Sequence, residues 1–390
     1  MKKIYFGVMF LMMSMLVCAA PRTVEQAASL AASFQNEQTQ KSGVRRAPAK
    51  AANMRLAKQV AKPTNMFEAA LYVFNNPNGG WVIISADDNT ETVIGYSNEG
   101  SFHGTQSNVI HMLNYYAERI DAASKMNETE KADFKAMRKA KKSVEPIAPL
   151  LKTKGIEWNQ GTPYNNMCPI DQGTGKRCPT GCVATAAAQI MAYWQWPATG
   201  EGYTEYDWYS GSGGHGHESA NFGATTYDWS NILQANYEKI SYTQEQADAV
   251  ALLNYHVGVA THMGYNSAGS ASGTDGMAEG MKHYFRYKRG KYWHSWEGSS
   301  GTWHSEGDRG DNGWDTINHW AQLADMFDED LEAGRPILMG GGGKSGSNGH
   351  EYVCEGRDEN RMYYINYGWG GNADNGYYLL DNMYSTHNGP

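Results

Sequence analysis

The sequence CVATAAAQIMAYW, residues 182–194, is rich in alanine and contains no glycine or proline. Such a run strongly favours a helix, and Thr180 and Gly181 directly before it mark the helix start. Cys182 is therefore predicted to lie at a helix N-terminus. Free N–H groups and the helix dipole stabilise an anion at that place, so we expect a lowered pKa for the Cys182 thiol. A thiolate there is a candidate nucleophile once a base is found.

A second feature lies at the N-terminus. Lys2 and Lys3 precede an apolar run over residues 4–17, and the small residues Ala19 and Ala20 follow. This order is typical of a secretory signal peptide, which we assign to residues 1–20. The run is short for a bilayer span and no later stretch is long enough, so we expect no stable membrane insertion. The protein is predicted to be secreted, into the medium, the periplasm or onto the cell surface.

The rest of the chain is long enough for two folded parts, and 41% hydrophobic residues suffice for real cores. Residues 21–145 have 16 Lys and Arg against 13 Asp and Glu, whereas residues 146–390 have 15 against 28. Opposite net charges would suit two parts that dock on each other, although ordinary solubility explains them equally well. No basic tract is large enough to indicate binding of nucleic acid.

The remaining cysteines have other predicted roles. Cys168 and Cys178 lie in one Gly-rich loop, where they could form a disulfide in an exported protein. A metal site would need further ligands nearby, and only distant histidines are available. Cys354 lies in an apolar segment. Cys18 belongs to the signal, where the bulky Val17 before it argues against a lipoprotein site.

Residues 21–144 are predicted to form a small α+β unit. Ala, Gln, Lys and Arg dominate up to about residue 64, with a helix at 25–35. Apolar residues at helical spacing predict a second helix over 110–120. Strand-like runs around an Asn-Pro-Asn-Gly-Gly turn, and one run after them, predict three strands: residues 70–74, 81–85 and 92–96.

A highly charged segment, residues 127–142, follows this unit. Asn127 and Glu130 form an N-terminal capping arrangement, which predicts a helix. Its basic end, residues 138–142, is a candidate exposed linker open to proteases, although the charges taken alone fit a solvated helix face better. We place the boundary between the two parts here, with the second domain at residues 145–390.

The second domain is also predicted to be α+β. A Gly- and aromatic-rich loop at 200–223 contains His215 and His217, which lack the further ligands that a metal site needs. Thr243 and Gln246 form a capping box for a helix over 245–262. Towards the C-terminus the pattern predicts a helix, a strand, a Gly/Ser loop and three antiparallel strands: residues 315–331, 336–339, 340–349, 351–354, 362–366 and 377–380.

His350 ends the Gly/Ser loop and precedes a strand, where its ring could face a helix end across a cleft. A neutral imidazole near Cys182 could accept the thiol proton and leave a thiolate that attacks an acyl carbon. Position alone does not distinguish His350 among the 12 histidines of the chain.

Three motifs together resemble the streptopain family of papain-like cysteine peptidases: TGCVATA followed by AQIM (within residues 180–191), GHEYV (349–353) and NYGWGG (366–371). Short matches also occur within residues 154–165. In the first unit, GWVIIS (80–85) and IGYS (94–97) resemble the pro-region of that family. The resemblance covers nearly the whole chain. It implies a papain-like domain, with the cysteine on a helical part and the histidine on an antiparallel sheet, preceded by a small α+β pro-domain.

The resemblance also implies the chemistry. Cys182 would be the nucleophile, and His350 would be the general base and then the acid that protonates the leaving amine. Gln160 would share the oxyanion hole with the backbone N–H of Cys182. No metal or organic cofactor is implied.

Two neighbouring positions would complete the site. Asn366 or the aromatic residues beside it would orient His350, and Trp369 would cover the site. The family has Trp where this chain has Tyr367, so the sequence leaves open which group holds the imidazole.

Substrate contacts are implied in the same way. Residues 267–272 resemble the Ser/Gly loop of the family, with Ser270 and Gly349 as backbone contacts to an extended peptide. A hydrophobic side chain two residues before the scissile bond is the expected preference. The family continues beyond the point where this sequence stops, so we expect either a fragment of a longer chain or a sheet that lacks one strand.

We therefore expect a secreted zymogen whose pro-region occupies the cleft and distorts the Cys–His pair until the chain is cut near residues 142–145. Its partners would be protein or peptide substrates and its own pro-region. The sequence leaves two alternative functions open. A transglutaminase-like or amidase activity would employ the same pair, and an aromatic-rich adhesion or glycan-binding protein is suggested by 12 Trp and 25 Tyr.

Overall fold

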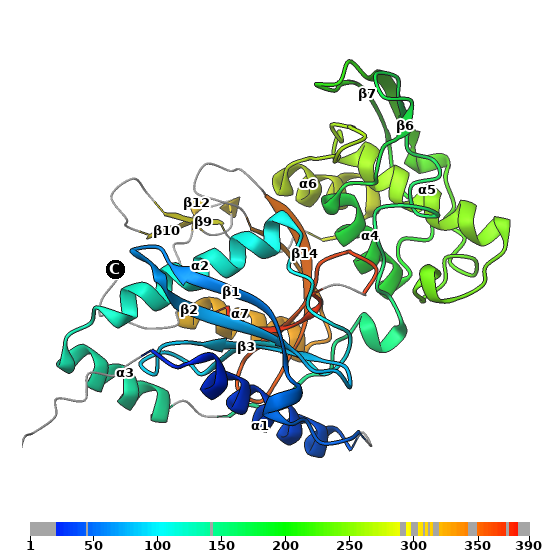
Figure 1. Ribbon diagram of the computed structural model, residues 1–390. Helices are drawn as coiled ribbons and strands as arrows, with labels where there is room; N and C mark the ends of the chain where they lie inside the picture. The colour runs from blue at the N-terminus through cyan, green and yellow to red at the C-terminus, as the bar shows by residue number, and fades with distance from the viewer. Residues whose placement is uncertain are drawn as a thin grey trace, which may run out of the picture.

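The computed structural model describes residues 21–43, 46–140, 143–288, 294–297, 303–306, 309–310, 313–314, 320–341, 349–371 and 374–380. The predicted signal peptide, the basic residues Lys141 and Lys142, and most of the Gly/Ser loop before His350 lie outside these ranges. The described chain is a mixed α+β structure (Figure 1), as the sequence predicts.

One antiparallel sheet of eight strands joins the two ends of the chain, in the order β1-β2-β3-β4-β16-β15-β14-β13. The N-terminal strands meet the C-terminal strands where β4 pairs with β16 and Tyr96 lies opposite Tyr377. The opposite charges of the two parts leave open whether they dock on each other, and in the structure strand pairing joins them into one sheet. The strands are β1 (Arg55–Lys62), β2 (Asn65–Asn75), β3 (Trp81–Ser85), β4 (Val93–Ser97), β13 (Ile337–Gly341), β14 (His350–Arg357), β15 (Tyr363–Asn366) and β16 (Gly376–Tyr378).

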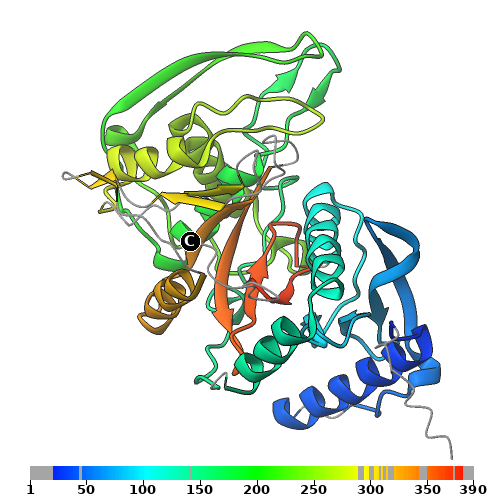
Figure 2. The same ribbon diagram turned by 90° about the vertical axis from the view of Figure 1, so that its left-hand side faces the viewer.

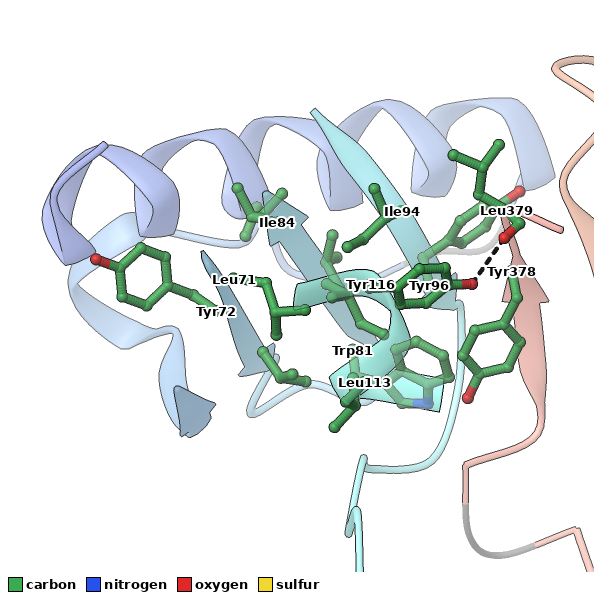
Figure 3. Close-up of a cluster of buried hydrophobic side chains, with 14 of the residues drawn as sticks. Leu71, Tyr72, Trp81, Ile84, Ile94, Tyr96, Leu113, Tyr116, Tyr378 and Leu379 are labelled. Carbon is green, nitrogen blue, oxygen red and sulfur yellow. Dashed lines mark hydrogen bonds between the residues drawn. The ribbon is translucent and has the colours of Figure 1, made fainter. Parts of the chain in front are cut away.

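The N-terminal strands are covered by two helices. Helix α1 (Val24–Ser42) packs on β3, and α2 (Ser107–Ser124) packs on β1 and β2. Every residue of β3 is buried, which is the pattern of a strand covered on both faces. Figure 3 shows this core, in which Tyr378 and Leu379 from the C-terminal part lie among side chains of the N-terminal part. The two parts therefore share one hydrophobic core.

A second core surrounds α4 (Cys182–Trp194), of which residues 183–192 are all buried. Helices α5 (Gln244–Ala260) and α6 (Thr274–Phe285) pack against α4, and Val353 of β14 joins the same core. Helix α7 (Trp320–Glu332) packs on β13 and β14. The helical layer and the sheet thus meet along α4 and β14.

The other elements are short helices and two-stranded ribbons. The helices are η1 (Ala51–Asn53), α3 (Glu128–Ala140), η2 (Lys152–Lys154), η3 (Phe222–Ala224) and η4 (Tyr237–Lys239). The ribbons are β5 (Ile170–Asp171) with β6 (Lys176–Arg177), β7 (Tyr203–Tyr209) with β8 (His215–Asn221), β9 (His294–Glu297) with β10 (Trp303–Glu306), and β11 (Arg309–Gly310) with β12 (Gly313–Trp314).

Some predicted elements differ from the observed ones. The predicted loop at 200–223 contains the hairpin β7–β8, since several of its glycines gather in the turn at residues 210–214. Strand β1 was missed because it is mostly exposed and polar, and α6 was missed because it contains two glycines. Helix α3 continues to Ala140, so the first residues of the predicted linker are helical. The segment that follows runs beside the far end of β14, where Ile147 bridges to Arg357.

The predicted helix caps are confirmed. The N–H of Gln246 donates to the hydroxyl of Thr243 at 3.3 Å, and the N–H of Thr243 donates back to the Gln246 side chain at 2.9 Å. The same reciprocal bonds join Asn127 and Glu130 at the start of α3. Strands 70–74, 81–85 and 92–96 and the three C-terminal strands also lie where the sequence predicts them, within a few residues.

The predicted disulfide is absent between two cysteines that the structure does describe. Cys168 and Cys178 are free thiols buried in the core around α4. Burial raises the pKa of Cys168 to about 12 and that of Cys178 to about 11. Both residues therefore act as small apolar side chains.

Candidate active site

Cys182 is the first residue of α4, as predicted. Gly181 before it has a φ of 86°, and a Cβ there would lie 3.0 Å from the carbonyl oxygen of Ser270, so glycine suits this position. The hydroxyl of Thr180 lies 2.7 Å from that of Thr185, one turn into the helix. These contacts fix the position of the thiol at the helix start.

The pKa of the Cys182 thiol is raised, which corrects the lowered value predicted from the helix dipole. Burial is the largest cause. The backbone N–H groups of Glu351, Val183 and Cys182 itself act in the opposite direction, because they stabilise the thiolate. The contact with the N–H of Glu351 also shows that the sulfur lies beside the first residues of β14.

His350 is the first residue of β14, and its side chain is buried. Its Nε2 donates a hydrogen bond to the carbonyl oxygen of Tyr367 at 2.8 Å. Its ring stacks on the indole of Trp369, with 4.9 Å between the ring centroids and an interplanar angle of 14°. Burial lowers the pKa of His350 to about 4, although the Tyr367 carbonyl acts in the opposite direction. Near neutral pH the imidazole is therefore uncharged, with its proton on Nε2 and a lone pair on Nδ1.

The thiol and the imidazole belong to adjoining elements. Glu351, whose N–H the sulfur contacts, directly follows His350 in β14. Within the described ranges, the structure shows no hydrogen bond between the Cys182 sulfur and the His350 ring. Both pKa shifts favour the neutral form of the group concerned, and the predicted transfer of the thiol proton to His350 stays a prediction.

Gln160 lies close to the nucleophile. Its carbonyl oxygen accepts a hydrogen bond from the N–H of Thr180 at 3.1 Å, two residues before Cys182. The neighbouring Asn159 side chain accepts from the N–H of Gly161 at 2.8 Å. The structure thus brings Gln160 to the start of α4, and its predicted part in the oxyanion hole stays a prediction.

Asn366 is engaged away from the imidazole. Its side-chain amide donates to the carbonyl oxygen of Ile156 and to Oε1 of Gln189, both at 3.2 Å. The next residue, Tyr367, holds His350 through its backbone carbonyl. Of the two alternatives that the sequence left open, the contacts of the ring are with the neighbouring aromatic residues, through the Tyr367 backbone and the Trp369 indole, and the Asn366 amide is bound within the core. A backbone carbonyl is present whatever the side chain, so Tyr in place of Trp leaves this bond intact.

Gln189 of α4 has a structural role that the sequence analysis missed. Its Oε1 accepts from the N–H of Trp158 at 2.9 Å as well as from the Asn366 amide. It therefore joins α4, β15 and the segment that leads to Gln160. The sequence feature that could have indicated this role is a polar residue inside a mostly apolar helix.

The two predicted substrate-binding residues lie next to the predicted catalytic ones. The hydroxyl of buried Ser270 donates to the carbonyl oxygen of Pro179 at 2.7 Å, and its own carbonyl packs against Gly181. Gly349 is exposed and directly precedes His350. Their contacts with a peptide stay a prediction.

The N-terminal part contacts the strands and loops beside His350. The hydroxyl of Tyr367 donates to the sulfur of Met112 in α2 at 3.1 Å. The hydroxyl of Tyr116, one turn further along α2, donates to the carbonyl oxygen of Leu379 at 2.8 Å (Figure 3). Figure 2 shows α2, in cyan, beside the orange and red C-terminal strands. The residue that holds the imidazole is therefore itself covered by α2.

Two buried carboxylates of the C-terminal part bind the N-terminal part. Asp374 accepts hydrogen bonds from the N–H groups of His103, at 2.7 Å, and Gly104, at 3.1 Å. Asp358 accepts from the hydroxyl of Tyr96 at 3.0 Å. Burial is the largest cause of a raised pKa at both carboxylates. These polar contacts fix the orientation of the N-terminal part on the sheet.

The other histidines that the sequence singled out lie outside this site. His217 is exposed on β8, where its Nδ1 lies 2.9 Å from the carboxylate of Asp207. In the part of the chain that the structure describes, no group of three or more His, Cys, Asp or Glu residues is arranged to hold a metal ion.

Residues 158–378 match the family model of the Peptidase C10 family. This match spans more than half of the chain and includes every candidate site residue. The chain belongs to the Peptidase C10 family. A second match, of residues 19–120 with the Spi protease inhibitor model, covers α1, β1 to β4 and most of α2 in this C10 chain.

Relatives of this C10 chain are known by name. Streptopain of Streptococcus pyogenes serotype M1 is 30% identical over 323 residues, which cover 80% of this chain and 74% of streptopain. The thiol protease/hemagglutinin PrtT of Porphyromonas gingivalis is 30% identical over 333 residues, 82% of this chain but 35% of PrtT. A solved fragment of Prevotella intermedia prointerpain A superimposes with a TM-score of 0.60 at 27% identity, covering 86% of this chain and 93% of the fragment.

These likenesses establish the class of enzyme. This C10 chain is a cysteine peptidase of papain-like α+β fold, with an inhibitor-like region in front of the peptidase, as in a zymogen. The family and fold predicted from the sequence motifs are confirmed. None of the helices within the described ranges is both long enough and apolar enough to cross a membrane.

Proposed function

We propose that this chain is the precursor of a secreted cysteine endopeptidase in which Cys182 attacks the substrate and His350 transfers the protons. The hydrogen bond from His350 Nε2 to the Tyr367 carbonyl carries this proposal. Because Nε2 keeps its proton in that bond, the neutral ring offers Nδ1 as a base. Cys182 supplies the sulfur at the neighbouring helix start.

The reaction would proceed in two halves. Nδ1 of His350 takes the thiol proton while Sγ of Cys182 bonds to the peptide carbonyl carbon, and the oxyanion is stabilised by the Cys182 N–H and the Gln160 amide. The imidazolium then protonates the leaving amine, the C–N bond breaks and a thioester remains. A water molecule deprotonated by the same ring attacks the thioester, releasing the acid product and restoring the thiol.

Tyr367 and Trp369 would hold the ring through both halves. The Tyr367 carbonyl favours the protonated imidazole, since it raises the pKa of His350 against the effect of burial. The indole of Trp369, 4.9 Å away and nearly parallel, keeps the plane of the ring fixed and shields one face from water. A fixed ring lowers the entropy cost of each proton transfer.

Residues 21–144 would act as an intramolecular inhibitor. The contacts of Met112 with Tyr367, of Tyr116 with Leu379 and of residues 103–104 with Asp374 support this role, because they bear on the elements that position His350. Cleavage near residues 142–145 would free the peptidase from this cover. The half-buried Cys182 thiol and the buried His350 ring, whose pKa shifts both favour the neutral form, fit a latent precursor.

The substrate would be an extended peptide. Ser270 and Gly349 would bind its backbone, and a hydrophobic side chain two residues before the scissile bond would be preferred. Support comes from the position of Ser270 against the segment that precedes Cys182, and of Gly349 next to His350. The predicted signal peptide at residues 1–20 supports secretion.

The test compares the full chain with Cys182→Ala and His350→Ala, using casein hydrolysis and the size of the precursor on a gel. We expect hydrolysis and self-shortening in the parent and neither in the two variants. His215→Ala, an exposed histidine of the β8 strand, is the matched control and should behave like the parent. Incorporation of an added amine in place of hydrolysis would identify a transferase and overturn the proposal.

A further inference from the structure

The carboxylate of Asp171, at the end of β5, joins three loops of the peptidase part. The side chain is fully buried. Its Oδ1 accepts from the N–H of Gly173, in its own loop, at 3.0 Å. Its Oδ2 accepts from the hydroxyl of Ser212 at 2.5 Å and from the hydroxyl and N–H of Ser267 at 3.1 and 3.3 Å. Ser212 lies in the turn of the β7–β8 hairpin, which Figure 1 shows at the edge of the molecule, and Ser267 begins the Ser/Gly loop.

The backbone around Asp171 is shaped for these contacts. A Cβ on Gly214, in the hairpin turn, would lie 2.4 Å from Oδ1 of Asp171. A Cβ on Gly173 would overlap the carbonyl oxygen of Ser212. Glycine at both positions allows the turn of the hairpin to close onto the β5–β6 loop. The junction is thus a close fit of two backbones around one carboxylate.

Asp171 is ionised in this arrangement. The hydroxyl of Ser212, and after it the N–H and hydroxyl of Ser267, hold the pKa of this carboxyl below its usual value. Several donors converge on Oδ2. A carboxylate oxygen can accept all of these hydrogen bonds, whereas a side-chain NH₂ group in its place can accept none of them. An asparagine at this position would keep the size of the side chain and lose part of the hydrogen bonding.

The Ser/Gly loop runs from this junction to the nucleophile. The hydroxyl of Thr174 donates to that of Ser267 at 2.8 Å, which adds a second tie at the outer end of the loop. At the inner end, Ser270 is bound to the carbonyl oxygen of Pro179, three residues before Cys182. The loop is therefore held at one end by the helix start and at the other by Asp171.

We propose that Asp171 is a positioning residue that fixes Ser267, at the outer end of the Ser/Gly loop (residues 267–272), and thereby sets the affinity for extended peptides. This inference rests on the proposed function, since it assigns the loop to the substrate side of the Cys182 site. Asp171 touches neither the thiol nor the imidazole, so it acts on substrate binding through Ser267. Its loss should raise KM while the chemical step at Cys182 continues.

The test uses the peptidase matured from the full precursor chain, in the parent and in the variants Asp171→Asn and Ser267→Ala. For a peptide substrate of six or more residues we expect KM to rise about tenfold in Asp171→Asn and a few-fold in Ser267→Ala, with kcat within about twofold. For a minimal substrate with one residue before the scissile bond, kcat/KM should change little. Asp207→Asn is the control, because this carboxylate lies on the same hairpin, is exposed and contacts His217.

A separate readout follows the nucleophile. The rate of alkylation of Cys182 by iodoacetamide should be the same in the parent and in Asp171→Asn, and absence of alkylation in the parent would instead count against the proposed function. A fall in kcat with unchanged KM, or kinetics of Asp171→Asn equal to those of Asp207→Asn, would overturn the inference. If Asp171→Asn does not fold, the inference is tested with Ser267→Ala and Ser212→Ala, and an unchanged KM in both variants would overturn it.

Discussion

The imidazole of His350 is held by the backbone of Tyr367, whose carbonyl oxygen accepts the Nε2 proton at 2.8 Å. A backbone acceptor makes the orientation of the ring independent of the side chain that follows Asn366. The side chain of Tyr367 is free to serve another contact, with Met112 of the inhibitor-like region.

Tyr367→Phe should therefore leave catalysis nearly intact. The variant keeps the carbonyl that binds His350 and loses only the hydrogen bonds of its hydroxyl, with Tyr378 and with the sulfur of Met112, which is a weak acceptor. We expect kcat/KM within about twofold of the parent and an unchanged pH profile, measured on the matured enzyme. A loss of activity comparable with that of His350→Ala would mean that the side chain, and not the backbone, holds the ring.

Asn366→Ala should lower stability and leave the pH dependence of catalysis unchanged. The substitution removes buried hydrogen bonds to Ile156 and Gln189, and we expect a loss of about 1–3 kcal/mol in the free energy of unfolding by urea. The pKa values read from the pH dependence of kcat/KM should match those of the parent. Shifted pKa values with an unchanged unfolding curve would favour Asn366, the other of the two orienting groups that the sequence left open.

Asp374→Ala should weaken latency. The carboxylate is buried and binds the N–H groups of His103 and Gly104, so its loss leaves two backbone donors without their partner at the contact between the two parts. We expect the precursor to shorten about five to ten times faster, followed on a gel. Lys41→Ala removes an exposed ion pair with Glu359 across the same contact and should change the rate by less than about twofold. Equal effects of the two variants would contradict this account.

Glu355→Gln should remove a pH dependence of stability. The side chain is fully buried, its Oε2 accepts from the N–H groups of Leu151 and Lys152, and burial raises its pKa to about 8. Between its ordinary value and about 8, the unfolded chain is ionised and the folded chain keeps the proton, so stability falls as pH rises. Each pH unit in that interval costs at most about 1.4 kcal/mol.

The free energy of unfolding, measured by urea from about pH 5 to about pH 8, checks this expectation. The parent should lose stability across the interval, whereas Glu355→Gln should lose less, because Gln cannot ionise and can still accept the two N–H bonds. Parallel curves for the two proteins would show that Glu355 is ionised in the folded chain.

The sequence predicted the parts of this site that depend on local pattern. An alanine-rich run placed Cys182 at a helix start, and the motif around His350 placed it at a strand start, because helix and strand signals are carried by neighbouring residues. The pKa of Cys182 could not be predicted in the same way. Burial outweighs the helix start there, and burial depends on residues far away in the chain.

The contacts between segments that are distant in the sequence also could not be predicted from the sequence pattern alone. The bond of His350 to a backbone carbonyl 17 residues later leaves no trace in side-chain identity. The pairing of β4 with β16 joins residues 93–97 to 376–378. Gln189 and Asp171 looked like ordinary polar residues in the sequence, and each gains its role only when three segments meet around it.

The shared sheet has a consequence for the released peptidase. If cleavage releases the N-terminal part, as proposed above, β16 will become an outer edge with unpaired N–H and C=O groups, and Tyr377 will lose the stacked ring of Tyr96, whose centroid now lies 4.9 Å away. Exposed edges invite pairing with other chains, but β16 is only three residues long and offers little template for aggregation. The shortness of β16 would then allow the inhibitor-like region and the peptidase to share one sheet without exposing a long, aggregation-prone edge after release.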